Sequence, residues 1–128
     1  MDKTTLTALA SFPGQLEAYY AAVPADHANW APDSWAGIPS EPFTPIGQLC
    51  HVRDIEIDGY YARIQRILRE STPALASIDG ERLARKRGYA TASATEVLGT
   101  ICAVTTSSIL PGCNGCWARL QPHSWPKH

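Results

Sequence analysis

The sequence has no marked excess of charge of either sign and no long hydrophobic run. Its 128 residues include 11 Lys and Arg against 12 Asp and Glu, which gives a net charge of -1. A near-neutral balance argues against a nucleic-acid-binding protein, which usually carries a basic surface, and against a strongly acidic disordered chain. The apolar stretches fall well short of the roughly 18 residues of a membrane span. We therefore expect no nucleic-acid partner and no membrane partner.

The first residues also do not have the pattern of a secretory leader. The segment from Met1 to Leu9 carries one Lys and scattered apolar residues, without the continuous apolar core of a signal peptide. We therefore expect a cytoplasmic protein with reduced thiols. Cys50 and Cys102 lie in apolar patterns, whereas Cys113 and Cys116 stand apart from any pattern. A chain of this length fits one small domain with one modest core.

Helical periodicity is the main positive signal, and it begins near the N-terminus. Apolar residues recur at steps of three and four from Leu6 to Val23, the spacing of one helix face. Pro13 interrupts this pattern, and proline is well tolerated only in the first turn of a helix. The pattern therefore predicts a helix that begins near Phe12 and ends before Pro24.

The best helix signal spans roughly Thr44 to Glu70. Thr44 supplies a cap, Pro45 occupies the first helical position, and Pro73 disfavours helix in the residue before it. We expect the apolar face of this helix to form the core seam of the protein. That face comprises Ile46, Leu49, Cys50, Ile57, Tyr60, Ile64, Ile67 and Leu68.

Two further segments flank this helix. The proline-rich stretch from Pro24 to Pro45 is interpreted as an ordered crossover loop, with Trp30 and Trp35 packed on the helices, because a disordered linker rarely holds two indoles. After the long helix, Asp79 is suited to cap a short helix that ends at Gly88. Together with the helices, these segments predict an all-α fold.

The C-terminal region changes in character. Ser93 to Glu96 forms a capping box that opens another helix, but residues 101–110 are rich in β-branched residues and contain four Ser and Thr in a row, which are weak helix formers. We expect residues 101–128 to form an irregular tail, and our hypothesis is that the chain is C-terminally truncated or read out of frame there. For some codon choices, Thr105 to His128 read one base earlier encode a Leu- and Ala-rich segment without Pro or Cys.

Residues 1–100 resemble the DinB (YfiT-like) superfamily. The resemblance is carried by a long ordered series of residues: Asn29-Trp30-Ala31-Pro32, Trp35, Phe43-Thr44, the run from Gln48 to Glu56, Asp58-Gly59-Tyr60, Arg63-Ile64, Asp79-Gly80 and Leu83-Ala84-Arg85. It implies an antiparallel four-helix bundle, here a partial one, which often forms a homodimer. It names no substrate, because members include thiol-dependent transferases, isomerases and many proteins of unknown activity.

The resemblance also implies a divalent metal, zinc or nickel. Many members bind it with one His on the second helix and a His-x-x-x-His pair on the last helix. His51 matches the second-helix ligand. A complete site of this kind would suggest a metal-dependent hydrolase or a thiol transferase.

Only part of such a site is visible in this sequence. A catalytic first-row metal needs about three protein ligands and an open position. Asp54 and Asp58 can share one helix face with His51 and are candidate oxygen ligands. His123 and His128 are five residues apart with a proline between them, so they cannot form the missing pair on one helix. We therefore expect a remnant metal ligand at His51 and no catalytic activity.

Three alternatives stay open. His51 could belong to a solvated helix stripe together with the two acids. A small zinc-stabilised binding module could use the terminal Cys113, Cys116, His123 and His128, whose spacing a zinc knuckle tolerates. A metal-free interaction protein is the third alternative. We expect His27 to be exposed in its loop, and the basic cluster from Arg82 to Arg87 to be the solvated side of the short helix.

Overall fold

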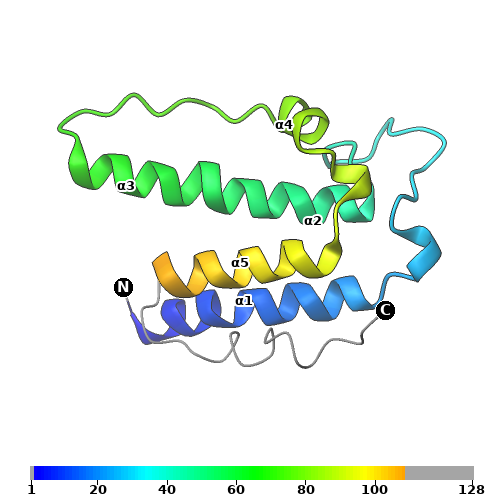
Figure 1. The fold of residues 1–128 in the computed structure, drawn as a ribbon, viewed down its shortest axis with the longest axis horizontal. Helices are drawn as coiled ribbons and strands as arrows, with labels where there is room; N and C mark the ends of the chain where they lie inside the picture. The colour runs from blue at the N-terminus through cyan, green and yellow to red at the C-terminus, as the bar shows by residue number, and fades with distance from the viewer. Residues whose placement is uncertain (1, 109–128) are drawn as a thin grey trace.

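The computed structural model describes residues 2–108. Within this range the secondary structure is entirely helical, without a strand, so the prediction of an all-α protein is confirmed (Figure 1). The main helices are α1 (Lys3–Ala21), α2 (Pro45–Asp54), α3 (Ala62–Arg69), α4 (Gly80–Arg87) and α5 (Ala94–Ser108). Shorter helical segments are η1 (Ala25–His27), η2 (Ile55–Tyr61) and η3 (Tyr89–Thr91).

Helix α1 begins much earlier than the sequence pattern predicted. The Asp2 side chain accepts a hydrogen bond of 2.8 Å from the backbone N–H of Thr5, which caps the helix at Lys3 rather than near Phe12. Pro13 therefore lies inside the helix, where it lacks a backbone donor. Its ring is buried, and this apolar burial offsets part of the cost of the missing hydrogen bond.

The predicted long helix is present as one continuous element from Pro45 to Arg69, made of α2, η2 and α3. Thr44 caps it by accepting a hydrogen bond of 3.2 Å from the N–H of Gly47. Its end is also where the sequence placed it, because Glu70 is already extended. The middle segment η2 is π-helical. This wider turn rotates the residues that follow it relative to a continuous α-helix.

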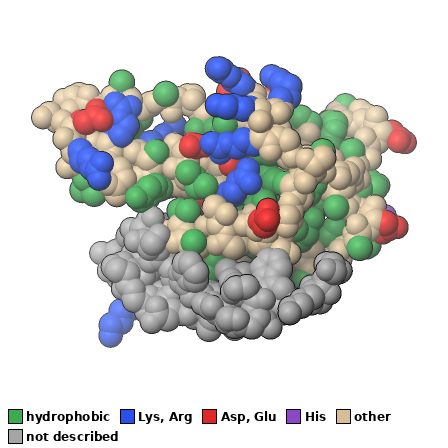
Figure 2. Space-filling model, viewed as in Figure 1, with side chains coloured by type: hydrophobic (Ala, Val, Ile, Leu, Met, Phe, Trp, Pro, Cys, Tyr) green, Lys and Arg blue, Asp and Glu red, His purple; other side chains and the backbone are tan. Residues whose placement is uncertain are grey.

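The predicted core seam is correct only for the first half of this helix. Ile46, Leu49 and Cys50 are buried, but Ile64 is 45% exposed and Ile67 is 55% exposed. Hydrophobic side chains are accordingly visible on the surface along α3 (Figure 2). The pattern assumed α-helical spacing throughout, and the π-helical segment η2 breaks that spacing before α3 begins.

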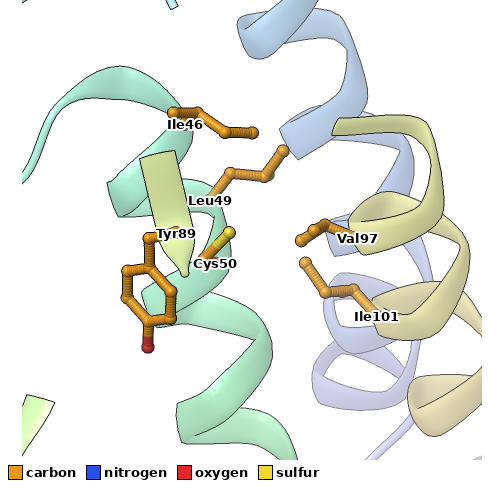
Figure 3. Packing of buried hydrophobic residues seen from close by; sticks show 6 residues of the cluster. All are labelled: Ile46, Leu49, Cys50, Tyr89, Val97 and Ile101. Atoms are coloured by element: carbon orange, nitrogen blue, oxygen red, sulfur yellow. The ribbon is translucent and has the colours of Figure 1, made fainter. Parts of the chain in front are cut away.

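The core lies between α1, α2 and α5. Helix α5 packs along both α1 and α2, and its Val97 and Ile101 face Leu49 and Cys50 of α2 (Figure 3). Three side chains of α1 pack against this cluster from the other side, namely Phe12, Leu16 and Tyr20. Figure 1 shows that α1 runs opposite to the other two, whereas α2 and α5 run in the same direction because the segment with α4 returns to the starting end. The α2–α5 pair is therefore parallel, unlike the expected antiparallel arrangement.

The loop between α1 and α2 is ordered, but one of its indoles does not pack as expected. Trp30 is 55% exposed, whereas Trp35 is partly buried. Backbone and amide hydrogen bonds hold the loop instead. The N–H of Ile46 donates to the carbonyl of Ala28 at 2.9 Å, and Asn29 Nδ2 donates to the carbonyl of Ala90 at 3.0 Å.

The predicted short helix is confirmed as α4. The Asp79 side chain accepts from the N–H of Arg82 at 3.0 Å, and Gly88 ends the helix with a φ of +59°. A left-handed conformation is readily adopted by glycine and costly for other residues. Both ends of α4 therefore follow from the sequence.

Helix α5 extends further than the sequence predicted. Ser93 Oγ accepts from the N–H of Glu96 at 3.4 Å, as a cap should, but the helix continues to Ser108. The expected irregular tail is therefore wrong for residues 101–108, and residues 109–128 lie outside the described part. Burial of Ile101 and Cys102 outweighs the weak helix propensity of this segment. Over residues 2–108, none of the helices has the length and apolar composition needed to cross a bilayer.

Candidate functional site

Helix α2 places His51 and Asp54 on a buried face that is covered by α4. His51 is 8% exposed and Asp54 is fully buried, so the alternative of a solvated stripe is wrong for both. The two residues are three positions apart and therefore share one side of the helix. Gly80 at the start of α4 lies against the His51 imidazole, and Arg87 at its end pairs with Asp54.

Asp54 is the centre of a buried network of charged and polar groups. Its Oδ1 is paired with Arg53 Nε at 2.9 Å and with Arg87 Nη1, and its Oδ2 accepts a hydrogen bond from the Tyr89 hydroxyl. Arg87 Nη2 also pairs with Asp58 Oδ2 at 2.8 Å. The network therefore ties α2, η2, α4 and η3 together.

The network fixes the charge states of its members. Burial raises the pKa of the Asp54 carboxyl, but hydrogen bonds from Arg53, Tyr89 and Arg87 outweigh this effect and hold the pKa below its usual value. Burial and the neighbouring carboxylate of Asp54 raise the pKa of the Tyr89 hydroxyl well above its usual range. At neutral pH the centre is therefore a carboxylate held by two guanidinium groups and a neutral phenol.

These contacts occupy the two acids that the sequence suggested as oxygen ligands of a metal ion. Both oxygens of Asp54 already have partners, and Asp58 shares Arg87 with it. A metal cation placed there would face the positive charges of Arg53 and Arg87 at short range. Asp54 and Asp58 therefore serve the packing of α4 on the long helix in this structure.

His51 has a different neighbour, the carboxylate of Glu41. The distance from His51 Nε2 to Glu41 Oε2 is 3.4 Å, and the Glu41 side chain is 61% exposed. The ring of Phe43 lies beside the imidazole, with 5.0 Å between centroids. A Cβ atom added to Gly80 would lie 2.9 Å from His51 Cε1, so α4 packs closely on the imidazole edge. Of the two ring nitrogens of His51, Nε2 is therefore the one that faces an acidic group, the carboxylate of Glu41 in the surface loop.

The pair of His51 and Glu41 fits two ligands of a divalent ion. Two ligand atoms about 2.0–2.2 Å from one tetrahedral zinc ion are about 3.3–3.6 Å apart, which matches the observed 3.4 Å. However, His51 Nδ1 is buried without a hydrogen-bond partner among the described residues. Histidine ligands usually donate this second ring N–H to an acceptor that orients them. The described residues therefore offer two candidate ligands, without an acceptor that would orient the imidazole.

The remaining predicted residues do not extend this site. His27 is exposed, as expected, and its Nδ1 lies 2.8 Å from Asp26 Oδ1. Residues 2–108 contain no group of three or more His, Cys, Asp and Glu placed to hold a metal ion. The terminal set of Cys113, Cys116, His123 and His128 lies outside the described residues.

The basic cluster on α4 is only partly solvated. Lys and Arg side chains gather over this helix (Figure 2), and Arg82, Arg85 and Lys86 are exposed. Arg87 is exposed as well, with 34% of its side chain accessible, but it also reaches Asp54 and Asp58. One of the four cations is therefore paired with two acids of the long helix while it stays in contact with solvent.

The sequence reasoning missed Glu41, Arg87 and Tyr89. Glu41 lies in a proline-flanked loop, and nothing in the local pattern indicates which helix the loop folds against. The sequence did contain a signal for partners such as Arg87 and Tyr89. Asp54 lies between apolar positions on the inner face of the predicted helix, and a buried carboxylate requires cationic or hydroxyl partners.

Comparisons with family models, with curated proteins and with solved structures gave no match for this chain. The resemblance to the DinB superfamily therefore stays a prediction. The expected homodimer, the absence of a nucleic-acid partner and the cytoplasmic location stay predictions as well.

Proposed function

We propose that this chain is a DinB-like helical-bundle protein without catalytic activity, which binds a divalent cation weakly at His51. The ordered series of family-like residues and the position of His51 on the second long helix support this proposal. The observation that carries it is the pair of His51 Nε2 and Glu41 Oε2, whose separation of 3.4 Å suits two ligands of one ion. Glu41 takes the place of a second ligand that the sequence did not reveal.

The absence of catalysis in this proposal follows from the contacts around His51. A catalytic zinc or nickel site needs about three protein ligands and one open position. The two acids that share the helix face of His51 are held by Arg53 and Arg87. Recruiting Asp54 as a ligand would take from Arg53, whose side chain is 18% exposed, the carboxylate with which it pairs, and this is costly.

A metal-free interaction protein is the second candidate, because apolar side chains are left uncovered. An open apolar groove of about 200 Å³ lies between α1 and α2. Six of its lining residues are Leu16, Tyr19, Tyr20, Val23, Leu49 and Val52. The zinc module of Cys113, Cys116, His123 and His128 is the third candidate.

Calorimetric titration with zinc and with nickel separates these candidates. Structural zinc sites with four ligands are worth about 10–16 kcal/mol, so a two-ligand site should bind with a dissociation constant of about 1 μM or weaker. We expect His51→Ala to abolish this binding and Cys113→Ser/Cys116→Ser to leave it unchanged. Zinc binding that is lost only in the cysteine variant would support the terminal module. No binding in any variant would support the metal-free protein.

A further inference from the structure

The outer face of α3 carries apolar side chains that no described segment covers. Four of the large exposed ones are Tyr60 at 56%, near the end of η2, and Ile64 at 45%, Ile67 at 55% and Leu68 at 75% in α3. They lie at or near helical spacing on consecutive turns, and Figure 2 shows hydrophobic side chains along this helix. Contiguous exposed apolar patches of this kind mark interaction sites. We refer to these four residues as the α3 face.

Besides the change of register at η2, the early end of the neighbouring helix α5 leaves the α3 face uncovered. Helix α5 packs along α2 and η2 and ends at Ser108. Figure 1 shows α3 extending past the end of α5. The chain that follows Ser108 therefore begins at the uncovered end of the long helix.

We propose that residues 109–128 fold back and cover the α3 face. This segment contains five large apolar side chains, namely Ile109, Leu110, Trp117, Leu120 and Trp125. Its 20 residues can span up to about 66 Å when extended, whereas the eight residues of α3 are about 12 Å long. The reach of the segment is therefore ample.

The tether decides between this segment and a second copy of the chain. A segment joined to the site by a short linker acts at an effective concentration of about millimolar, which a second copy does not reach at ordinary protein concentrations. The charged residues at α3 do not oppose a contact between residues 109–128 and the α3 face. Arg66 is already paired with Glu70 at 2.8 Å, and Arg69 is exposed on the same helix, where an indole face can accept its guanidinium.

Tryptophan fluorescence tests this proposal in the full chain. In a Trp30→Phe/Trp35→Phe background, only Trp117 and Trp125 report. We expect a blue-shifted emission that moves to the red in Leu68→Asp, together with increased quenching by acrylamide. Leu68 is 75% exposed, so this variant should keep the helical fold, which circular dichroism checks. The matched control is Ile38→Asp, an exposed residue of the loop between α1 and α2, which should leave the emission unchanged.

Two results would overturn the proposal. One is an emission typical of water-exposed indoles in the parent chain. The other is an emission that responds equally to Leu68→Asp and to Ile38→Asp. Sedimentation of the same samples identifies the other occupant, because a dimer that dissociates in Leu68→Asp would show that a second copy covers the α3 face. A concentration-independent monomer in the parent chain supports the tethered segment.

Discussion

Asp54 illustrates how one buried charge can join several helical segments. It is fully buried, yet it contacts two arginines and a tyrosine that come from three different segments. A buried ion pair adds little net stability over apolar packing, but removing one partner leaves the other charge uncompensated. Asp54 is therefore expected to be far more sensitive to substitution than the other acids of this chain.

The substitution Asp54→Asn tests this role at constant shape. Removing one partner of a buried pair costs about 3–5 kcal/mol, and because Arg87 is 34% exposed we expect a loss of about 2–4 kcal/mol. The control is Asp58→Asn, whose side chain is 36% exposed and which should cost at most about 1 kcal/mol. Urea unfolding measures both. Equal small losses would show that the network does not hold α4 in place.

Tyr89 provides a prediction on the alkaline side. Its pKa is raised in the folded protein by burial and by Asp54, whereas an unfolded tyrosine titrates at about pH 10. The stability that this group contributes is therefore fully present below about pH 10 and is lost as the pH rises toward the folded pKa. We expect Tyr89→Phe to make the alkaline fall in unfolding free energy shallower. The control Tyr19→Phe, at a residue that is 77% exposed, should leave the slope unchanged, and an unchanged slope in Tyr89→Phe would contradict this account.

At the scale of elements, the contact between α4 and α2 depends on Gly80. An Ala side chain there would place Cβ 2.9 Å from His51 Cε1, so the imidazole or the helix must shift. We expect Gly80→Ala to cost about 1–3 kcal/mol, as overpacking of buried sites does. The matched control is Gly14→Ala in α1, where an added Cβ meets nothing within 4 Å and should stabilise the helix by about 0.5–1 kcal/mol. We expect the midpoint of thermal unfolding to fall in Gly80→Ala and to rise in Gly14→Ala. A stabilising Gly80→Ala would refute the close packing.

The ends of individual helices were predictable where a local capping residue sets them. Thr44 and Asp79 cap the long helix and α4 as expected, and Gly88 ends α4. The failures occurred where tertiary packing overrides local preference. Pro13 is accommodated inside α1, and α5 continues because Ile101 is buried. Helix propensity is a weak guide in both places.

The inner face of the long helix could be predicted only as far as its α-helical spacing lasts. Ile46 and Leu49 lie before η2 and are buried, whereas Ile64 and Ile67 lie after it and are exposed. Nothing in the apolar pattern distinguishes a π-helical turn from an α-helical one. The error is therefore one of register within a correctly located helix.

At the scale of the whole molecule, the sequence found half of the candidate site. His51 was predicted as the metal ligand from a family resemblance. The structure buries this residue under α4 and does not leave it on a solvated face. Glu41 could not be found from sequence, because it meets His51 only after the loop folds back over α2. Asp54 was placed on the same helix face as His51, but its partners Arg87 and Tyr89 could not be found from the sequence, because they reach it from distant parts of the chain.

The most direct measurement of the central claim is a nitrogen-15 NMR spectrum of the histidine side chains during zinc titration. The account predicts that the Nε2 signal of His51 moves first and that Glu41→Gln weakens this response, because Nε2 faces Glu41 Oε2. It also predicts that Asp54→Asn lowers the stability of the protein and leaves its affinity for zinc unchanged. If the signals of His123 and His128 move first, or if the His51 signal is unaffected by saturating zinc, the site proposed at His51 and Glu41 is wrong.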